Sequence, residues 1–525
     1  MIDLLIKKQQ SLKNDILSGL TVALALIPEA IAFSFVAHVD PRVGLYAAFM
    51  VGLITAVFGG RPGMISGATG AVAVIFAPLV IEQTAAFGMA TALNALFVAV
   101  IIMGLLQCLF AFFRWGKFVR LIPHPVMFGF VNGLAIVIFK AQFSQFYVGS
   151  GASAQLISGM PMVVMLALIA LTMAIIQFLP KLTTVVPATL VAIVSVTALA
   201  MGLQTAGFEI YTVLDFIQRM DPTKTTLAVG FPTFILPQIS WSLIVTVFPY
   251  AFLAAAVGLI ESLMTLTLVD ELTDTRGRGN KESFGQGLAN IINGFFGGMG
   301  GCAMIGQSMI NIRAGGRGRL SGITAAVSLL IFILFTASLI EKIPLAALIG
   351  VMFMVSIATF EWSSVRLFKK IPRSDFVVIF LVSVTTVLVD LAVAVLVGIV
   401  VSALSFAWKQ SRQIEHQRQQ KQDGTTCYLL KGALFFGSCS TFKAIFEYKN
   451  DADRVTMDFT HARVCDHSGI EALQFVIQRY AKLQKKVNLI NIGQDCAALL
   501  TQAEMDVEMQ VSELKRWRVA DDRLA

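Results

Sequence analysis

Apolar segments follow one another from Ile16 to Trp408, and this pattern limits the fold more than any other feature of the sequence. A helix needs about 20 residues to cross a bilayer, and several of these segments are too short to cross alone. Only 14% of the residues are charged, against about 25% in a soluble domain. The sequence therefore predicts an α-helical polytopic membrane protein with 14 transmembrane segments. We expect them at 16–37, 43–58, 64–82, 90–113, 124–146, 160–179, 185–203, 241–268, 283–298, 302–312, 320–340, 344–361, 374–390 and 392–408.

Basic residues are distributed unevenly among the connecting loops, and this predicts the orientation of the protein. Short cytoplasmic loops carry an excess of Lys and Arg. With the N-terminus inside, the cytoplasmic loops are the even-numbered ones, and these are the basic ones. The tail after Lys409 is then also cytoplasmic, and the formal charge of +8 needs no nucleic acid partner. The basic residues of the even-numbered loops are Arg61, Arg114, Lys117, Arg120, Lys181, Arg276, Arg278, Lys281, Arg313, Arg317, Arg319, Arg366, Lys369, Lys370 and Arg373, and those of the odd-numbered loops are Arg42, Arg219, Lys224 and Lys342.

The sequence lacks the motifs of an enzyme or of a structural metal site. It has no P-loop, nucleophile elbow or metal motif, and its histidines lack ligand spacing. The cysteines occur singly, so we interpret them as free thiols. We expect no enzymatic reaction, no cofactor and no structural metal. The cysteines are Cys108, Cys302, Cys427, Cys439, Cys465 and Cys496.

Two Gly-rich segments open the third and tenth spans, seven spans apart. The third opens RPGMISGATGAVAVIF and the tenth GGMGGCAMIGQSMIN. Matched broken segments in two halves indicate a transporter site made by inverted repeats. Two facing half-helix N-termini would offer N–H groups and positive dipole ends to an anion. The alternative is that the glycines only permit close helix packing.

The expected anion contacts lie where these two half-helices begin. Thr69 would offer a hydroxyl and its neighbours would offer N–H groups, although Thr69 could equally serve only as a helix cap. The tenth span would contribute through its backbone alone. The candidate residues are Thr69, Gly70, Ala71, Ala303, Met304 and Gly306.

Glu261 lies in the middle of a long apolar run, which marks it as a candidate site residue. A carboxylate at bilayer depth costs about 2.5–3.5 kcal/mol on insertion scales, and such groups usually face a cavity and have a function. Thr265 lies four residues on and shares its helical face. We interpret this pair as a coupling-ion site for Na⁺ or for a proton. The alternative is a protonated carboxyl group that only holds helices together.

The character of the sequence changes after Trp408. We expect a transmembrane domain at 1–408, a charged linker at 409–424 and a small α/β domain at 425–525. Partial alternation predicts strands in YLLKGALFFGS, RVTMDFTHARV and KVNLINIG. The segments SGIEALQFVIQRYAKLQKK and DCAALLTQAEM are predicted amphipathic helices.

Several motifs, taken in order and spacing, resemble those of the sulfate permease (SulP) family, which includes prestin and the pendrin-type anion exchangers. The run PEAIAF (28–33) resembles the motif of the first helix, and PRVGLY followed by FGG resembles the signature around the second. The segment NIRAGGRGRLS resembles the one after the tenth helix, and DHSG (466–469) resembles a turn of the STAS domain. The resemblance covers nearly the whole sequence.

The resemblance implies a fold of seven-plus-seven inverted repeats. A core domain of spans 1–4 and 8–11 would move against a gate domain of spans 5–7 and 12–14, with the anion between the N-termini of spans three and ten. It also implies a homodimer in the bacterial inner (cytoplasmic) membrane with cytoplasmic STAS domains. In related bacterial regulators a Ser at the place of Ser468 is phosphorylated, but we do not expect that role here.

Two positions depart from the family pattern. Gln307 stands where many eukaryotic members have Arg, so a fixed positive charge is missing and a bound cation at Glu261 would replace it. Glu29 stands where Gln is usual, and it adds a second acid near the site. Gln307 could donate to the anion or turn to a gate helix. Phe33 could line the anion pocket or serve only in packing.

Glu261 and Thr265 match, residue by residue, the acid and the Thr of the eighth helix in cyanobacterial sodium-dependent bicarbonate transporters. That likeness implies a further Na⁺ contact from the backbone near Ala303. Ile305 stands where those proteins have a Thr, which weakens the sodium site.

The expected function is secondary active transport of a small inorganic anion by Na⁺ or H⁺ symport, through an elevator-like movement of core against gate. Bicarbonate is favoured and sulfate is next. The alternatives are a proton-coupled dicarboxylate transporter and a non-transporting membrane scaffold that acts through its STAS domain. The expected partners are the anion, the coupled cation and the lipid bilayer.

Overall fold

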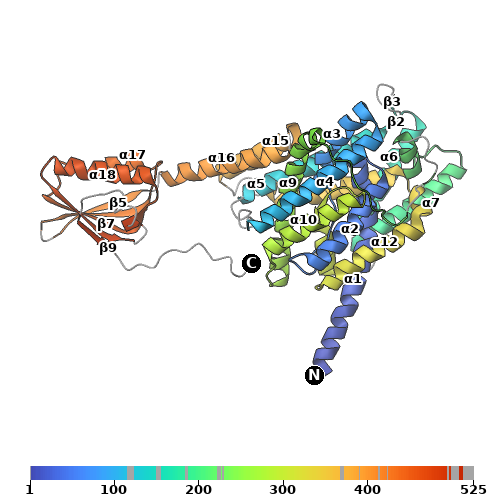
Figure 1. Cartoon of the computed structure of the whole chain (residues 1–525), viewed down its shortest axis with the longest axis horizontal. Coiled ribbons are helices and arrows are strands. Elements are labelled where there is room, and N and C mark those ends of the chain that lie inside the picture. Colours follow the sequence, from blue (N-terminus) through green and yellow to red (C-terminus); the bar gives the residue numbers. More distant parts are fainter. Residues whose placement is uncertain are drawn as a thin grey trace. The chain divides into compact units, whose positions relative to one another are not determined.

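The computed structural model describes most of the sequence and divides it into two compact units. The first is a membrane unit that ends at Gly398, and the second, from Ile399 to Arg523, is the C-terminal unit (Figure 1). Some residues named above lie outside the described residues. They are most of the predicted helix at 495–505 and the basic loop residues Lys117, Arg120, Lys224, Lys369 and Lys370. The described ranges are 2–114, 123–148, 155–183, 187–220, 226, 230–366, 372–389, 391–411, 414–421, 424–493, 496–497, 500 and 508–511.

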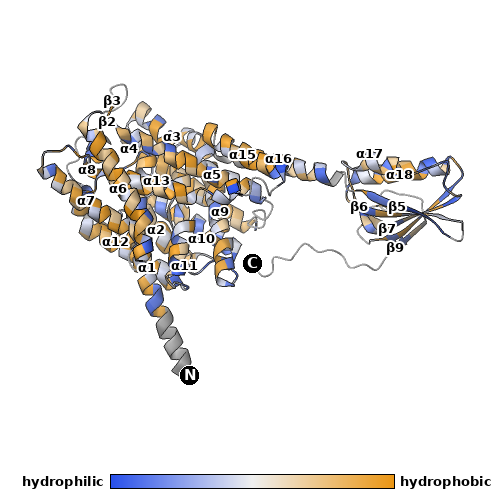
Figure 2. Cartoon of the chain, turned by 180° about the vertical axis from the view of Figure 1, so that it is seen from behind, coloured by the Kyte–Doolittle hydropathy of each residue, from blue (hydrophilic) through white to orange (hydrophobic). Residues whose placement is uncertain are grey.

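The membrane unit is built of helices that are hydrophobic over most of their length (Figure 2). Among the described residues, nine helices are long and apolar enough to cross a membrane. The count of 14 transmembrane segments stays a prediction, because several helices are short. The helices are α1 (Ile2–Val36), α2 (Pro41–Phe58), α3 (Gly70–Phe87), α4 (Met89–Phe112), α5 (His124–Ala141), α6 (Met160–Leu182), α7 (Ala188–Thr205), α8 (Val213–Met220), α9 (Trp241–Thr273), α10 (Gly279–Phe295), α11 (Ile305–Arg313), α12 (Arg319–Glu341), α13 (Leu345–Thr359), α14 (Trp362–Arg366), α15 (Arg373–Leu388) and α16 (Leu391–Ser411).

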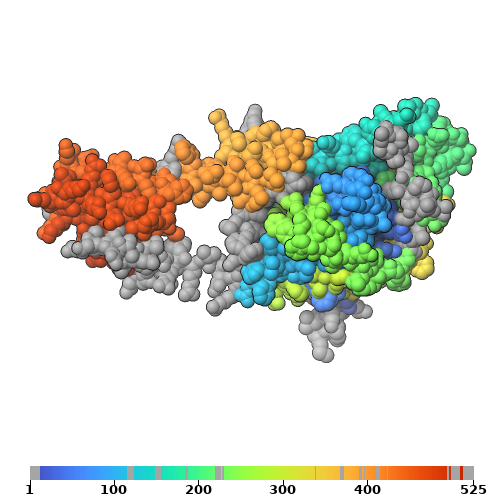
Figure 3. All heavy atoms as spheres, turned by 45° about the horizontal axis from the view of Figure 1, so that its top comes forward, coloured from blue at the N-terminus to red at the C-terminus, as the bar shows by residue number. Residues whose placement is uncertain are grey.

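The packing of these helices repeats with a shift of seven spans. Helix α4 packs on α10 as α12 packs on α2, and α1 packs on α12 as α9 packs on α4. Likewise α3 contacts α9 as α11 contacts α1, and α15 contacts α5 as α13 contacts α6. Segments that are distant in sequence therefore lie side by side, as the adjacent blue residues of α3 and α4 and green residues of α9 show (Figure 3). This is the arrangement expected of two structural repeats.

A two-stranded sheet lies between the repeats and holds the two half-helices together. Strand β1 (Ser66–Ala68) precedes α3, and strand β4 (Gly301–Ala303) precedes α11. They pair antiparallel, with Gly67 opposite Cys302. A Cβ atom on Gly301 would overlap the carbonyl oxygen of Gly67, so glycine is required for this approach. A separate hairpin, β2 (Tyr147–Val148) with β3 (Gln155–Leu156), follows the 3₁₀ helix η2 (Gln142–Phe146).

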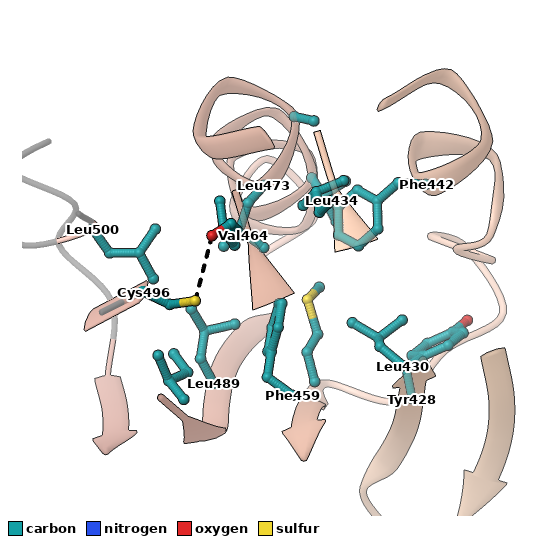
Figure 4. Packing of buried hydrophobic residues seen from close by; sticks show 14 of the residues in the cluster. Tyr428, Leu430, Leu434, Phe442, Phe459, Val464, Leu473, Leu489, Cys496 and Leu500 are labelled. Carbon is teal, nitrogen blue, oxygen red and sulfur yellow. Dashed lines mark hydrogen bonds between the residues drawn. The ribbon is translucent and has the colours of Figure 1, made fainter. Parts of the chain in front are cut away.

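The C-terminal unit contains a five-stranded sheet in the order β5-β6-β7-β8-β9. The first pair is antiparallel and the others are parallel. Phe442 of α17 and Leu473 of α18 pack against strand residues in one hydrophobic core, at whose edge the Cys496 thiol donates to the carbonyl oxygen of Val464 at 3.4 Å (Figure 4). The elements are β5 (Glu415–Gln420), β6 (Thr426–Leu434), α17 (Cys439–Ala444), β7 (Arg454–Val464), α18 (His467–Ala481), β8 (Lys486–Ile492) and β9 (Glu508–Val511).

The structure differs from the expected linker at 409–424. Residues 415–420 form β5, which pairs with β6 along its whole length, for example Glu415 with Lys431. All six β5 side chains are exposed, so the segment lacks the apolar alternation that signals a strand in the sequence. The strand exists because β6 offers it a free edge, which is a tertiary cause.

Candidate functional site

Helix α3 begins at Gly70, and Thr69 before it is its N-cap, in extended conformation. The Thr69 hydroxyl makes no capping hydrogen bond and lies 3.2 Å from Cys302 Sγ. The first intrahelical bond runs from the Ala73 N–H to the Thr69 carbonyl, so the N–H groups of the preceding turn have no partner inside the helix. The Phe33 ring and the Ile138 side chain pack over Gly70, and an atom of each lies 2.8 Å from the position that a Cβ on Gly70 would take. Thr69 is thus a cap by backbone geometry, with its hydroxyl left for another partner.

Helix α11 begins at Ile305 with Met304 as its N-cap, and here the structure corrects one expectation. The Ala303 N–H donates to Ser262 Oγ at 3.1 Å, and the Met304 N–H donates to the carbonyl oxygen of Ile65 at 2.9 Å. Both N–H groups are used by the fold, so these residues do not supply the N–H donors that we expected for an anion. The N–H groups without an intrahelical partner are those of Ile305, Gly306 and Gln307.

Gly306 is exposed at the start of α11, and a Cβ atom placed on it would meet no atom within 4 Å. Its surroundings differ from those of Gly70, which is covered by two side chains. Gly306 therefore offers an approachable stretch of backbone at the positive end of a half-helix.

Glu261 of α9 faces the paired strands. Its Oε2 atom accepts a hydrogen bond from Cys302 Sγ at 3.1 Å. Thr265 is buried on the same face, and its hydroxyl donates to the carbonyl oxygen of Glu261 at 2.7 Å. A Cβ on Gly258 would lie 3.4 Å from Cys302 Cβ, so this small residue lets α9 approach β4 closely. Cys302 is therefore the side chain that connects the predicted cation position with the predicted anion position.

Glu29 and Gln307 form a second polar contact close to the half-helices. The Gln307 amide donates to Glu29 Oε2, and both side chains are buried. Glu29 lies on α1, which by our span numbering belongs to the core. The amide therefore binds an acid of the core, a partner that we did not consider from the sequence. Donation to an anion through its second N–H stays a prediction.

A buried polar stripe on α10 supports the strands from behind, and sequence reasoning missed it. Gln286 Nε2 donates to Ser66 Oγ at 2.8 Å and to Glu282 Oε1 at 2.9 Å. Asn290 receives the Gly301 N–H and donates to the Gly301 carbonyl, each at 2.9 Å. The signal was present, because Glu282, Gln286 and Asn290 follow one another at four-residue intervals on one helical face.

A metal-ligand cluster or an ion pair among the described residues would be a possible partner of the Glu261 carboxyl group. No group of three or more His, Cys, Asp or Glu side chains that could hold a metal ion occurs among them. In the same part of the structure, the ion pairs of the membrane unit are Arg42 with Asp40 and Arg61 with Asp270, and neither includes Glu261. Within these residues, no basic side chain is paired with the central carboxyl group.

Comparison with known proteins identifies the family. Residues 12–382 match the model of the sulfate permease family, and residues 417–515 match that of the STAS domain. The chain belongs to the sulfate permease family. A permease family moves solutes and does not convert them, in agreement with the expectation that no enzymatic reaction occurs.

Relatives within the sulfate permease family have been named for two anions. YbaR of Bacillus subtilis (strain 168), whose assignment as a sulfate transporter is provisional, is 42% identical over 94% of this chain and 98% of its own. The bicarbonate transporter BicA of Picosynechococcus is 33% identical over 75% of this chain and 70% of its own.

Solved structures carry the same fold. The transmembrane domain of a cyanobacterial BicA matches with a TM-score of 0.64 and 30% identity, over 73% of this chain and 97% of that one. The murine solute carrier 26 family member A9 matches with a TM-score of 0.78 and 16% identity, over 93% of this chain and 87% of that one. This second likeness concerns the fold alone. The sulfate permease fold expected from the motifs is therefore confirmed.

Proposed function

We propose that this protein is a secondary active transporter of a small inorganic anion, driven by symport of a proton or Na⁺. The observation that carries the proposal is the position of Glu261, whose carboxyl group is linked through Cys302 to Thr69 at the N-terminus of α3. An anion at this N-terminus and an ionised Glu261 repel each other. Neutralisation of Glu261 by a cation therefore favours anion binding, and the reverse holds equally.

Bicarbonate is the first candidate substrate and sulfate the second. The relatives named for bicarbonate and sulfate support both, and the site contains two helix N-termini that suit an oxyanion. The Gln307 amide donates one of its two N–H groups to Glu29, so the anion would depend on backbone N–H groups, on the Thr69 hydroxyl and on the second N–H of Gln307.

Oxygen atoms at Glu261 bear on the choice of cation. Na⁺ needs several oxygen ligands, as hard cations do. Glu261 supplies its carboxylate, and the Thr265 hydroxyl keeps lone pairs because it acts as a donor to the Glu261 carbonyl. Backbone oxygen near Ala303 would complete the set. A coupled proton would need no ligand other than the carboxyl group of Glu261.

The site supports an elevator-like movement of core against gate. Its polar residues belong to α1, α3, α9, β4 and α11, all in the segments that we assign to the core. The gate contributes apolar contact, such as that of Ile138 of α5 with Gly70. A core that carries the whole site can move past the gate without breaking the site's hydrogen bonds.

The second candidate function is proton-coupled transport of a dicarboxylate. Glu29 and Glu261 provide two carboxyl groups near the half-helices, and two protons would balance a divalent anion. In the scaffold alternative only the STAS domain acts. That alternative does not explain why a carboxyl group lies within apolar helices, where insertion of a charged group is energetically costly. A homodimer in the bacterial inner membrane, with the STAS domain in the cytoplasm, remains part of the proposal.

The test is uptake into liposomes that contain the purified protein. Labelled bicarbonate, sulfate and fumarate are offered under imposed proton or Na⁺ gradients. We expect gradient-driven uptake of one of them by the wild type and its loss in Glu261→Gln. Glu271→Gln is the matched control, because Glu271 is exposed on the same helix. Absence of uptake of all three anions by the wild type would disprove transport, and full gradient-driven uptake by Glu261→Gln would disprove the coupling role.

A further inference from the structure

Thr69, Cys302 and Glu261 form a continuous hydrogen-bonded relay through the middle of the membrane unit. Thr69 Oγ1 and Cys302 Sγ lie 3.2 Å apart, and either atom can be the donor. Cys302 Sγ lies 3.1 Å from Glu261 Oε2. Thr69 and Cys302 are 2% and 0% exposed, so water does not compete freely for these bonds. The relay joins the N-terminus of α3 to the carboxyl group of α9.

The direction of the relay depends on the charge of Glu261. A thiol has one proton to donate and accepts through its sulfur, and a hydroxyl likewise donates once. An ionised Glu261 can only accept, so it takes the Cys302 S–H, and the sulfur then accepts the Thr69 O–H. Thr69 is left with lone pairs alone toward the helix N-terminus, and these repel an anion.

A protonated Glu261 imposes the opposite direction. Its Oε2–H donates to Cys302 Sγ, the S–H turns to Thr69 Oγ1, and the Thr69 O–H is released toward the N-terminus of α3. The covalent change is one O–H bond, formed between the carboxylate and one proton from solution. The other changes are rotations about the Cβ–S and Cβ–O bonds.

We propose that protonation of Glu261 reverses this relay and thereby converts Thr69 from an acceptor into a donor toward the transported anion. The inference rests on the proposed function and deepens it, because it makes the proton the coupled cation and makes Cys302 a positioning residue. Na⁺ would leave the carboxylate able to accept the S–H. It would neutralise Glu261 without reversing the relay.

The structure provides independent support at Thr69. Its hydroxyl is buried at a helix N-terminus and makes no capping bond, although capping is the usual role of Thr at this position. The hydroxyl is therefore available for a second task. The neighbouring α11 N-terminus is open at Gly306, which leaves room for a ligand at the paired half-helices.

The other ionisable groups on α9 and on the elements packed against it either have partners outside the relay or are exposed. Glu82 of α3 is exposed and accepts from the Tyr250 hydroxyl of α9. Glu282 of α10 accepts from the Gly60 N–H, and Asp270 of α9 pairs with Arg61. The remaining ionisable groups on these elements are Cys108 of α4, Lys281 of α10, Arg313 of α11 and Glu271 of α9.

The experiment measures binding of labelled sulfate, and of labelled bicarbonate with the concentration of the bicarbonate ion held constant, to the purified full-length protein over a range of pH in Na⁺-free buffer. The wild type should bind the anion more tightly as the pH falls. Cys302→Ala should still bind, because Thr69 is then free to donate at every pH. Its gain in affinity at low pH should shrink by at least about tenfold, the lower end of the value of one hydrogen bond to a charged group. Cys302→Ser, which keeps one donor and an acceptor, should retain the full gain.

The matched control is Cys108→Ala on α4, whose thiol lies 3.9 Å from the Phe284 carbonyl, away from the relay. It should behave as the wild type. Glu261→Gln should bind with no pH dependence, which tests the proposed function separately. A wild-type pH dependence in Glu261→Gln would disprove the coupling carboxyl itself.

Three outcomes would overturn the relay alone, given a flat profile for Glu261→Gln. One is a gain for Cys302→Ala equal to that of the wild type. Another is complete loss of binding in Cys302→Ala while Cys302→Ser binds normally. The third is that the wild type binds the anion weakly at every pH in the absence of Na⁺, and that addition of Na⁺ restores tight binding.

Discussion

The Gln307 side chain donates a hydrogen bond to Glu29, although the two residues are 278 positions apart. The bond ties the half-helix α11 to α1, and both side chains are buried. The resemblance to the sulfate permease family marks both positions as departures, because it implies Gln at position 29 and, in many eukaryotic members, Arg at position 307. The two departures from the family pattern are therefore partners, and we expect them to act together.

A double-mutant cycle tests this partnership. Glu29→Ala and Gln307→Ala should each lower stability, because each leaves a buried polar group without its partner, at about 1–3 kcal/mol. The double variant should lose less than the sum. Denaturant unfolding of the purified protein measures the three values. Strict additivity would show that the contact does not contribute in the folded protein.

Gly301→Ala should prevent the paired strands from forming. Its Cβ would overlap the Gly67 carbonyl, and neither backbone can retreat, because Asn290 holds both polar groups of Gly301. We expect loss of folded protein, measured by size-exclusion chromatography and thermal unfolding. Gly202→Ala is the control, since a Cβ there meets no atom within 4 Å and alanine suits a helix interior. A stable Gly301→Ala protein would contradict the close approach.

Gly306→Ala should leave the fold intact and weaken anion transport. The added methyl group meets no atom of the protein, but it projects beside the first turn of α11. One extra methyl group in a binding site costs about 10- to 200-fold in specificity, so we expect uptake to fall by at least about tenfold. Thermal unfolding should be unchanged. Normal uptake would remove this end of α11 from the anion site.

Asp451 should be a main determinant of stability in the C-terminal unit. Its buried carboxylate accepts from the hydroxyls of Tyr428 and Tyr480 and pairs with Arg418 of β5 at 2.9 Å. Removing one partner of a buried ion pair costs about 3–5 kcal/mol in stability. Because Arg418 is partly exposed, we expect Asp451→Asn to lower the free energy of unfolding by about 3 kcal/mol, the lower end of this range. Hydrogen exchange of β7 in the full-length protein measures the effect.

The control for Asp451→Asn is Glu415→Gln. It breaks the ion pair of β5 and β6 between Glu415 and Lys431, whose side chains are both 70% exposed. Such a pair contributes about 1 kcal/mol or less. Equal effects of the two substitutions would disprove the importance of burial at Asp451.

The same cluster predicts sensitivity to alkaline pH. Burial, and then the hydrogen bond to Asp451, raise the pKa of Tyr480 above its usual value of 10. A raised folded-state pKa gives stability that is complete below pH 10 and is lost as the pH rises above it. The loss is about 1.4 kcal/mol per pH unit for one tyrosine. Tyr480→Phe should flatten the pH dependence of unfolding above pH 10, and an unchanged slope would contradict this account.

The sequence by itself determined the class of the fold and most of its longer elements. Apolar length predicted the helices of the membrane unit, and paired Gly-rich openings predicted two half-helices seven spans apart, which the structure joins through β1 and β4. Alternation predicted β6, β7 and β8, and an amphipathic pattern predicted α18. These features depend on a few neighbouring residues, so local hydropathy and backbone preference are enough to reveal them.

Only the tertiary structure decided which polar groups meet. Cys302, judged from the sequence to be an ordinary free thiol, lies between Thr69 and Glu261. The N–H groups of Ala303 and Met304, expected to face an anion, are used by the fold instead. Such contacts join residues from different helices, and a buried donor takes whichever acceptor the packing places within reach. Spacing along the sequence carries no record of that choice.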